Sequence, residues 1–161
     1  CDADMAVLGI NTARSATFSG GRLSREQVRD MARVFSTMPP QRLRIAAFHH
    51  PLRPPASAPY LPVVGGAGRA IAGLAAAGVR VVLTGHYHRS YASLLAPLDP
   101  LRNDLLLIHA GTAMSLRRRD EANSYNVLDV APDHVTCTTL MIEEGRFVPV
   151  RTDSYVWGEN G

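Results

Sequence analysis

Apolar residues in the first half of the chain occur in short runs that polar and turn-forming segments separate. The runs at 5–11, 42–50 and 79–85 hold mostly small, aliphatic and β-branched residues, and each ends in polar residues or glycine. Runs of this length, bounded by turn signals, are typical of strands that are buried on both faces of a parallel sheet. The pattern therefore predicts three buried strands.

Two helices are predicted between these strands. The apolar residues of 23–38 recur at helical spacing: Val28, Met31, Val34 and Phe35. Ser24 and Gln27 have the separation of a capping box, and Pro39 ends the helix. The small-residue segment 68–78 predicts the second helix. Strands and helices that alternate in this way are typical of an α/β layer.

The pattern changes after His88, where strand-like segments follow one another through turns. These segments are 90–97, 104–111, 124–131, 134–142 and 146–153. With no helical pattern between them, we predict antiparallel hairpins for this half of the chain. No repeat or flexible linker interrupts the sequence, so residues 1–161 are predicted to belong to a single domain.

Composition and charge exclude several classes of protein. Of the 161 residues, 46% are hydrophobic and 19% are charged, which is typical of a soluble globular chain. The longest apolar region, 71–84, is too short to span a membrane and contains Arg80. A net charge of +3 is too small to predict nucleic-acid binding, and the RRR run at 117–119 is interpreted as a solvated loop.

The two ends of the sequence and its cysteines bear on where the protein works. No signal peptide is visible at the N-terminus, and the chain enters a strand without an initiator Met, so we expect it to be cut from a longer protein. Cys1 and Cys137 do not form a disulfide framework. We therefore expect a reducing compartment, the cytoplasm.

Polar residues follow the three predicted strands of the first half. They are Asn11 after the first strand, His49 and His50 after the second, and His86 and His88 after the third. Ligands bind at the carboxyl ends of strands in open α/β sheets, so these side chains should converge. Residues two apart on an extended segment point to one side, and Gly85 is expected to provide the bend. Imidazole is a ligand of Zn, Fe and Mn, which makes this edge a candidate metal site.

Four segments together resemble the C-terminal half of the calcineurin-like metallophosphoesterases. They read GINTARS…GGRLSREQ, IAAFHHPL, VVLTGHYHRSY and IHAGTAMSLRRR…SYNVLDV. The bacterial cyclic-nucleotide phosphodiesterase-like branch is the most similar. The resemblance implies an α/β fold, a partial four-layer αββα sandwich of mixed sheets flanked by helices, with the N-terminal half absent. It also implies a dinuclear centre whose bridging hydroxide attacks phosphorus.

The resemblance assigns roles to particular residues. It implies that His49 and His86 bind one divalent ion and that His88 binds the other, the ions being Mn, Fe or Zn. Asn11, Arg14, His50 and Tyr87 are candidates for contact with a small phosphoester substrate, although His50 could equally cap a strand end. His109 has no place in the family's motifs, so we expect a structural role for it.

The motifs of the N-terminal half of that family are absent from this sequence. Asp-x-His, Gly-Asp-x-x-Asp and Gly-Asn-His-Asp/Glu supply the bridging carboxylate, the asparagine ligand and the proton-donating histidine. CDAD at 1–4 has no preceding strand and no following His, so it does not replace them. No catalytic residue beyond the metal ligands is therefore expected here. We expect weakly occupied metal positions, an inactive fragment, and either self-association or a partner that carries the missing half.

Three functions remain open at this point. The first is a metal-dependent phosphodiesterase or phosphatase, of which this chain carries part of the site. The second is a non-catalytic scaffold or interaction module on the same fold. A β-lactamase-like metallohydrolase is a third, but it expects His-x-His-x-Asp-His, and HYHRSY has neither the Asp nor the third His.

Overall fold

The computed structural model describes residues 4–13, 20–95, 104–114 and 121–157. Strands and helices alternate through the first half: β1 (Met5–Gly9), α1 (Arg25–Ser36), β2 (Leu43–Ala47), α2 (Ala67–Ala76) and β3 (Val79–Thr84). Only strands follow in the described part of the second half: β4 (Tyr91–Leu95), β5 (Leu105–His109), β6 (Ser124–Val130), β7 (His134–Glu143) and β8 (Arg146–Val156). This order confirms the predicted sequence of elements.

The first sheet has five strands in the order β1-β2-β3-β5-β4. The strands β1, β2, β3 and β5 are parallel to one another, and β4 is antiparallel to β5. The prediction of antiparallel pairing throughout the second half is therefore wrong for β5, which also pairs in parallel with β3. The reason is burial: every residue of β5 is buried, which suits an inner strand, whereas β4 is only partly buried and forms the edge.

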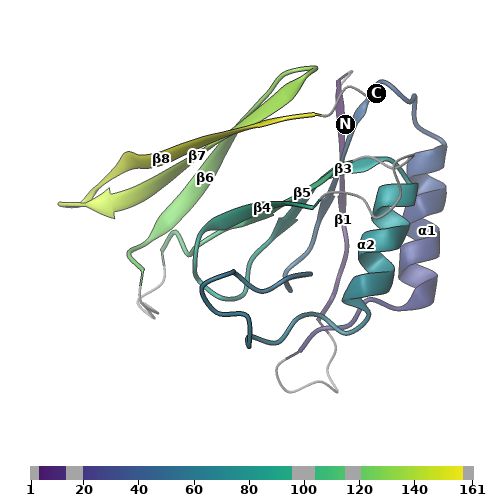
Figure 1. The fold of residues 1–161 in the computed structure, drawn as a ribbon, viewed down its shortest axis with the longest axis horizontal. Helices are drawn as coiled ribbons and strands as arrows, with labels where there is room; N and C mark the ends of the chain where they lie inside the picture. Colours follow the sequence, from purple (N-terminus) through teal and green to yellow (C-terminus); the bar gives the residue numbers. More distant parts are fainter. Residues whose placement is uncertain (1–3, 14–19, 96–103, 115–120, 158–161) are drawn as a thin grey trace.

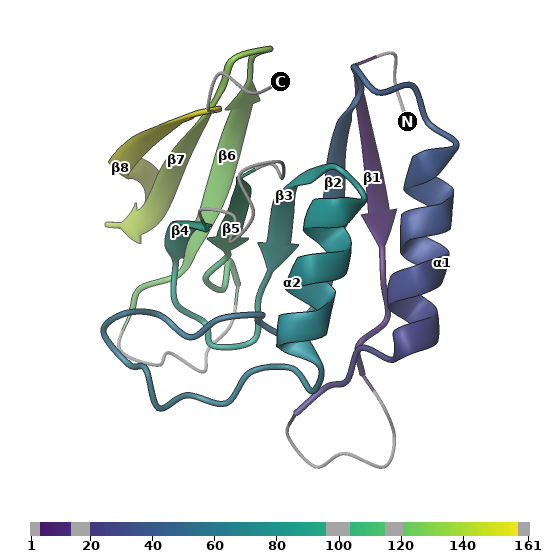
Figure 2. The ribbon, with the colours of Figure 1, turned by 45° about the vertical axis from the view of Figure 1, so that its right-hand side comes forward.

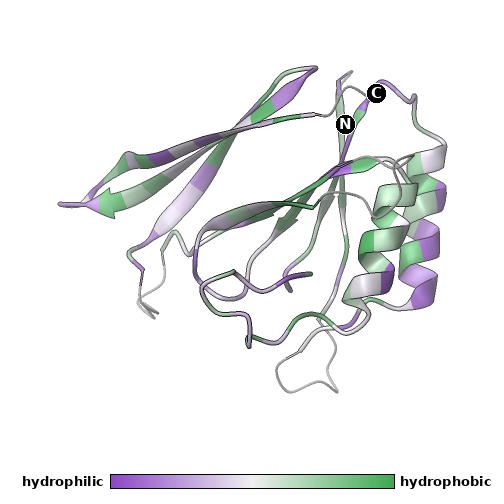
Figure 3. Ribbon diagram, viewed as in Figure 1, coloured by the Kyte–Doolittle hydropathy of each residue, from purple (hydrophilic) through white to green (hydrophobic). Residues whose placement is uncertain are grey.

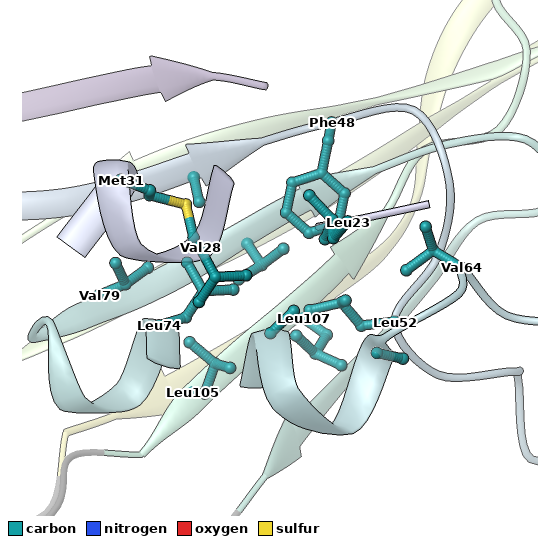
Figure 4. Packing of buried hydrophobic residues seen from close by; sticks show 14 of the residues in the cluster. Leu23, Val28, Met31, Phe48, Leu52, Val64, Leu74, Val79, Leu105 and Leu107 are labelled. Atoms are coloured by element: carbon teal, nitrogen blue, oxygen red, sulfur yellow. The ribbon is translucent and has the colours of Figure 1, made fainter. Parts of the chain in front are cut away.

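Helices α1 and α2 cover one face of this sheet (Figure 2). The capping box of α1 is present as predicted, since the Ser24 hydroxyl accepts from the Gln27 amide at 3.1 Å and the Gln27 side chain accepts in return at 3.0 Å. The helices pack on the sheet through a continuous apolar core (Figure 4) that includes Leu23, Val28, Met31, Phe35, Leu74, Val79, Val82 and Leu107. Val34, which shares the helical spacing of Val28, Met31 and Phe35, is 40% exposed.

The second sheet is an antiparallel meander in the order β6-β7-β8, and it lies across the other face of the first sheet (Figure 1). A second apolar core joins the two sheets through Ile45, Val81, Leu106, Ile108, Val135, Cys137 and Trp157. The described residues thus form three layers, and no described helix covers the outer face of β6-β7-β8. Hydrophobic and hydrophilic residues both occur along these strands (Figure 3). The predicted fold class, a partial αββα sandwich, is confirmed.

Two further expectations concern single features. Cys137 is a buried free thiol in β7, whereas Cys1 lies outside the described residues. Among the described helices, none is long and apolar enough to cross a membrane.

Candidate metal centre

The parallel strands end at one edge of the first sheet (Figure 2). Three histidine rings lie close together there. His49 and His50 follow β2, and His86 follows β3. Two backbone hydrogen bonds continue beyond these strands, from the Phe48 amide to the Leu83 carbonyl and from the Gly85 amide to the His49 carbonyl, both at 3.0 Å. The two segments that carry the histidines are therefore held side by side.

The three rings are close enough to share one ion. One ring nitrogen from each of His49, His50 and His86 lies within 4.8 Å of the others. The Nε2 atom of His49 is 3.1 Å from the Nδ1 atom of His86. Two imidazole nitrogens bound to one tetrahedral ion at about 2.0–2.1 Å are separated by about 3.3 Å. The His49–His86 pair therefore has the spacing of two ligands of a single divalent ion.

The backbone of the GHYH segment differs from what the sequence predicted. The prediction that Gly85 makes the bend is wrong, since the left-handed residues are His86, with φ of 90°, and His88, with φ of 60°. The segment is therefore not extended at these two residues. A left-handed backbone is unusual for residues other than glycine, and it costs about 1–3 kcal/mol at each position. Such strain is found at functional sites, where the surrounding structure imposes it.

The ring of His109 is hydrogen-bonded to this strained segment. Its Nδ1 atom is 2.8 Å from the Thr84 hydroxyl, and its Nε2 atom accepts the Tyr87 amide at 3.4 Å. The ring also stacks on Tyr91 at 4.6 Å. Burial, with smaller contributions from His86 and His49, lowers the pKa of His109 to about 3, so the ring is neutral. This is the structural role that was predicted for it.

His50 is bound to a residue of the loop after β1. Its Nδ1 atom lies 2.8 Å from the Oγ1 atom of Thr12, and both residues are buried. Burial and the nearby His49 lower the pKa of His50. The ring is therefore anchored, unlike a side chain that only terminates a strand.

The other predicted site residues lie in different surroundings. Among the described residues, the three-histidine group does not include His88. Tyr87 is 5% exposed, and its hydroxyl donates to the Pro62 carbonyl, so its side chain is part of the interior. Asn11 is exposed and its side chain accepts the Ala13 amide at 2.9 Å. Arg14 and the run 117–119 lie outside the described residues.

Two threonines were missed by the sequence analysis. Thr12 and Thr84 each place a hydroxyl 2.8 Å from the Nδ1 atom of a buried histidine. Thr12 is distant from His50 in the sequence, and no motif connects the two residues. Thr84 ends an apolar run in the predicted strand, and that position was the only signal that could have singled it out.

Comparisons with known proteins bear on the fold. No family model and no curated protein matches the chain. The solved structure of GAP50, described as the anchor in the inner membrane complex of Plasmodium, matches with a TM-score of 0.60 and 12% identity. The match covers 95% of this chain and 49% of that one, so the chain spans about half the length of GAP50.

Two structures of Vps29 match less closely. Vps29 from Entamoeba histolytica has a TM-score of 0.41 and 11% identity, over 92% of this chain and 98% of that one. Vps29 from Chaetomium thermophilum has a TM-score of 0.38 and 12% identity, over 93% and 95%. The layers, the strand order and the GAP50 match together describe the fold as a partial αββα sandwich.

Proposed function

We propose that this chain provides histidine ligands to the metal centre of a phosphoesterase. The observation that carries the proposal is the 3.1 Å separation of His49 Nε2 and His86 Nδ1 at the carboxyl edge of a parallel sheet. The strained backbone at His86 supports it, because the fold maintains an unfavourable conformation at this residue. The proposed reaction is hydrolysis of a small phosphodiester or phosphomonoester, and the proposed branch is the cyclic-nucleotide phosphodiesterase-like one.

The residues divide the work in a simple way. His49 and His86 would hold one divalent ion, and His88 would contribute to a second one. An ion held there would polarise a phosphoryl oxygen and lower the pKa of a bound water. His109 keeps the loop of His86 in place through the Tyr87 amide.

The proposal requires ligands from outside the three-histidine group. Within the described residues this group contains no carboxylate, and sites that hold two ions draw on several ligands for each. We propose that a further part of the protein or a partner chain supplies them, and that Mn, Fe or Zn are the ions. We also propose a cytoplasmic location, since the described Cys137 is a free thiol.

Turnover of bis(p-nitrophenyl) phosphate with Mn²⁺ tests this function. The 161-residue chain alone is expected to show no appreciable turnover, because the ions are not held at the spacing that clamps both oxygens. The chain produced with a metallophosphoesterase N-terminal half should turn over, and His86→Ala should abolish this activity. His134→Ala, at an exposed histidine of β7, is the control that retains it. Unchanged turnover in His86→Ala would contradict the proposal.

A non-catalytic scaffold is the second candidate. It is favoured by the match to GAP50, which is described as an anchor, and by the apolar residues on the outer face of the second sheet. On this hypothesis the chain binds a protein partner or a second copy of itself without any ion. A reconstituted protein that binds a partner, holds no metal and hydrolyses no phosphoester would favour the scaffold over the enzyme.

A further inference from the structure

His50 is fixed on one side by Thr12. The Oγ1 atom of Thr12 lies 2.8 Å from Nδ1 of the ring and also accepts the backbone amide of His50 at 3.4 Å. Thr12 is 1% exposed and His50 is 8% exposed. Because the Thr12 hydroxyl is buried, bulk water cannot replace the His50 ring as its hydrogen-bond partner. The orientation of the ring is therefore well determined.

Gly21 lies against the ring near the same nitrogen. A Cβ atom at this position would lie 2.5 Å from the Thr12 carbonyl oxygen and 2.6 Å from the ring carbon Cε1 of His50, and closer still to Nδ1. The backbone around Gly21 is itself tied down, because its carbonyl accepts the Gly65 amide at 2.8 Å and the next amide, that of Arg22, donates to the Thr12 carbonyl at 3.0 Å. Only glycine leaves room for the ring at this point.

The bonds to Thr12 favour one tautomer of His50. A threonine hydroxyl has one proton to donate and two lone pairs that accept. The backbone amide of His50 occupies a lone pair, which favours donation of the hydroxyl proton to Nδ1. A neutral imidazole that accepts at Nδ1 carries its own proton on Nε2. In this state Nε2 donates a hydrogen bond and does not bind a metal ion.

We propose that His50 is not a metal ligand but donates a hydrogen bond from Nε2 to a phosphoryl oxygen of the anion bound beside it, with Thr12 as the positioning residue. This inference rests on the proposed function for the ion that His49 and His86 hold. The three rings are close together, since one nitrogen of each of His49, His50 and His86 lies within 4.8 Å of the others. An anion on an ion held by His49 and His86 would therefore be near the His50 ring, because a metal–oxygen bond of about 2.1 Å and a hydrogen bond of about 2.8 Å span a similar length.

The tautomer is measured first, on the metal-free chain, by long-range ¹H–¹⁵N NMR of the histidine rings. The unaltered chain should show His50 protonated at Nε2 and unprotonated at Nδ1. Thr12→Val keeps the shape of the side chain but removes the hydroxyl, so this preference should be lost. Thr12→Ser restores the hydroxyl and should retain it. A proton on Nδ1 of the unaltered chain would overturn the inference without touching the proposed function.

The binding role is measured by titration of Zn²⁺ and then of methylphosphonate, a non-hydrolysable phosphate analogue. His50→Ala should change the affinity for Zn²⁺ by less than about twofold, but should weaken methylphosphonate binding to the Zn²⁺-loaded chain by about tenfold or more. Thr12→Val should weaken methylphosphonate binding in the same direction, and Thr12→Ser should not.

Three results would contradict this expectation in different ways. A loss of Zn²⁺ affinity in His50→Ala as large as that in His49→Ala would make His50 a ligand and overturn the inference. Unchanged methylphosphonate affinity in His50→Ala would overturn it as well, while the metal site stands. Failure of the unaltered chain to bind Zn²⁺ even when it is produced with a metallophosphoesterase N-terminal half would instead overturn the proposed function, and with it the anion contact that depends on the ion.

Discussion

The two sheets of this protein differ in how completely they are covered. The inner strands of the five-stranded sheet pack against helices on one face and against the second sheet on the other. The three-stranded sheet is covered on its inner face alone within the described residues, and Tyr125, Val127 and Phe147 are at least 36% exposed. The five-stranded sheet, which is covered on both faces, is also the sheet whose strands precede the three-histidine group.

This difference shows what each sheet contributes. A parallel strand that is buried on both faces places its polar groups at its carboxyl end. The ends of β2 and β3 therefore position His49 and His86. The second sheet contributes no member of the three-histidine group. It supports the first sheet through its inner face, while its outer face is available for a further layer or partner.

The largest expected effect comes from the interface between the sheets. Leu106 is fully buried there, so Leu106→Ala should lower the free energy of unfolding by about 2–5 kcal/mol. Leu94 is its cross-strand partner on the edge strand β4 and is 41% exposed. Leu94→Ala, the matched control, should cost clearly less in urea denaturation. Equal costs would show that the edge is covered as fully as the centre.

A smaller effect is expected from the polar interior of the first sheet. His109→Phe keeps an aromatic ring at this position but leaves the Thr84 hydroxyl and the Tyr87 amide without their partner. The expected loss in free energy of unfolding is about 2–4 kcal/mol. Tyr91→Phe removes the hydrogen bond from the Tyr91 hydroxyl to the Arg53 carbonyl. It should lower the free energy of unfolding by about 1 kcal/mol or less. If His109→Phe leaves the free energy of unfolding unchanged in thermal or urea denaturation, His109 does not have this structural role.

The pH dependence of stability tests the same residue. The pKa of His109 is lowered from 6.5 to about 3 in the folded chain, chiefly by burial. Between these values the unfolded chain binds more protons, so the free energy of unfolding falls as the pH is lowered, by up to about 1.4 kcal/mol per pH unit. Its full contribution is present above pH 6.5.

The variant His109→Phe isolates this contribution. The pKa of His50 is also lowered, and its effect persists in the variant. Urea denaturation at intervals between about pH 7 and pH 4.5 should therefore give a shallower slope for His109→Phe than for the unaltered chain. Identical slopes would show that His109 is protonated in the folded protein.

The smallest expected effect is on the outer face of the second sheet. Val127 is 42% exposed there, so Val127→Thr should change the free energy of unfolding by about 0.5 kcal/mol or less. Val135→Thr, on the covered inner face, buries a hydroxyl and should cost at least about 1 kcal/mol. If Val127→Thr is the more costly of the two in urea, a second copy or another layer already covers the outer face.

Local signals in the sequence predicted much of the fold. Ser24 and Gln27 marked the start of α1 because a capping box depends on neighbouring residues. The parallel pairing of β5 with β3 was not predicted. The partners of a strand depend on its position in the sheet, and the most apolar strands take the positions that bury them most. The uninterrupted apolar run of β5, in which all residues are buried, was the available signal for an inner strand.

The candidate site was only partly predictable. The sequence indicated that the residues after β2 and β3 converge, because this follows from parallel strands. It could not show that His86 and His88 have left-handed backbones, since the contacts of this segment, such as that of the Tyr87 amide with His109, join residues far apart in the sequence. The pairing of Thr12 with His50 depends on two loops that meet only in the folded chain.

Calorimetric titration of Zn²⁺ into the chain tests most directly the claim that the edge of the first sheet binds metal. The account predicts that one ion binds, and that His49→Ala and His86→Ala each weaken binding at least tenfold. The exposed His134 of the second sheet provides the control, and His134→Ala should leave the affinity unchanged. Equal Zn²⁺ affinity in the unaltered chain, His49→Ala and His86→Ala would contradict the account, because the ion would then bind somewhere other than this edge.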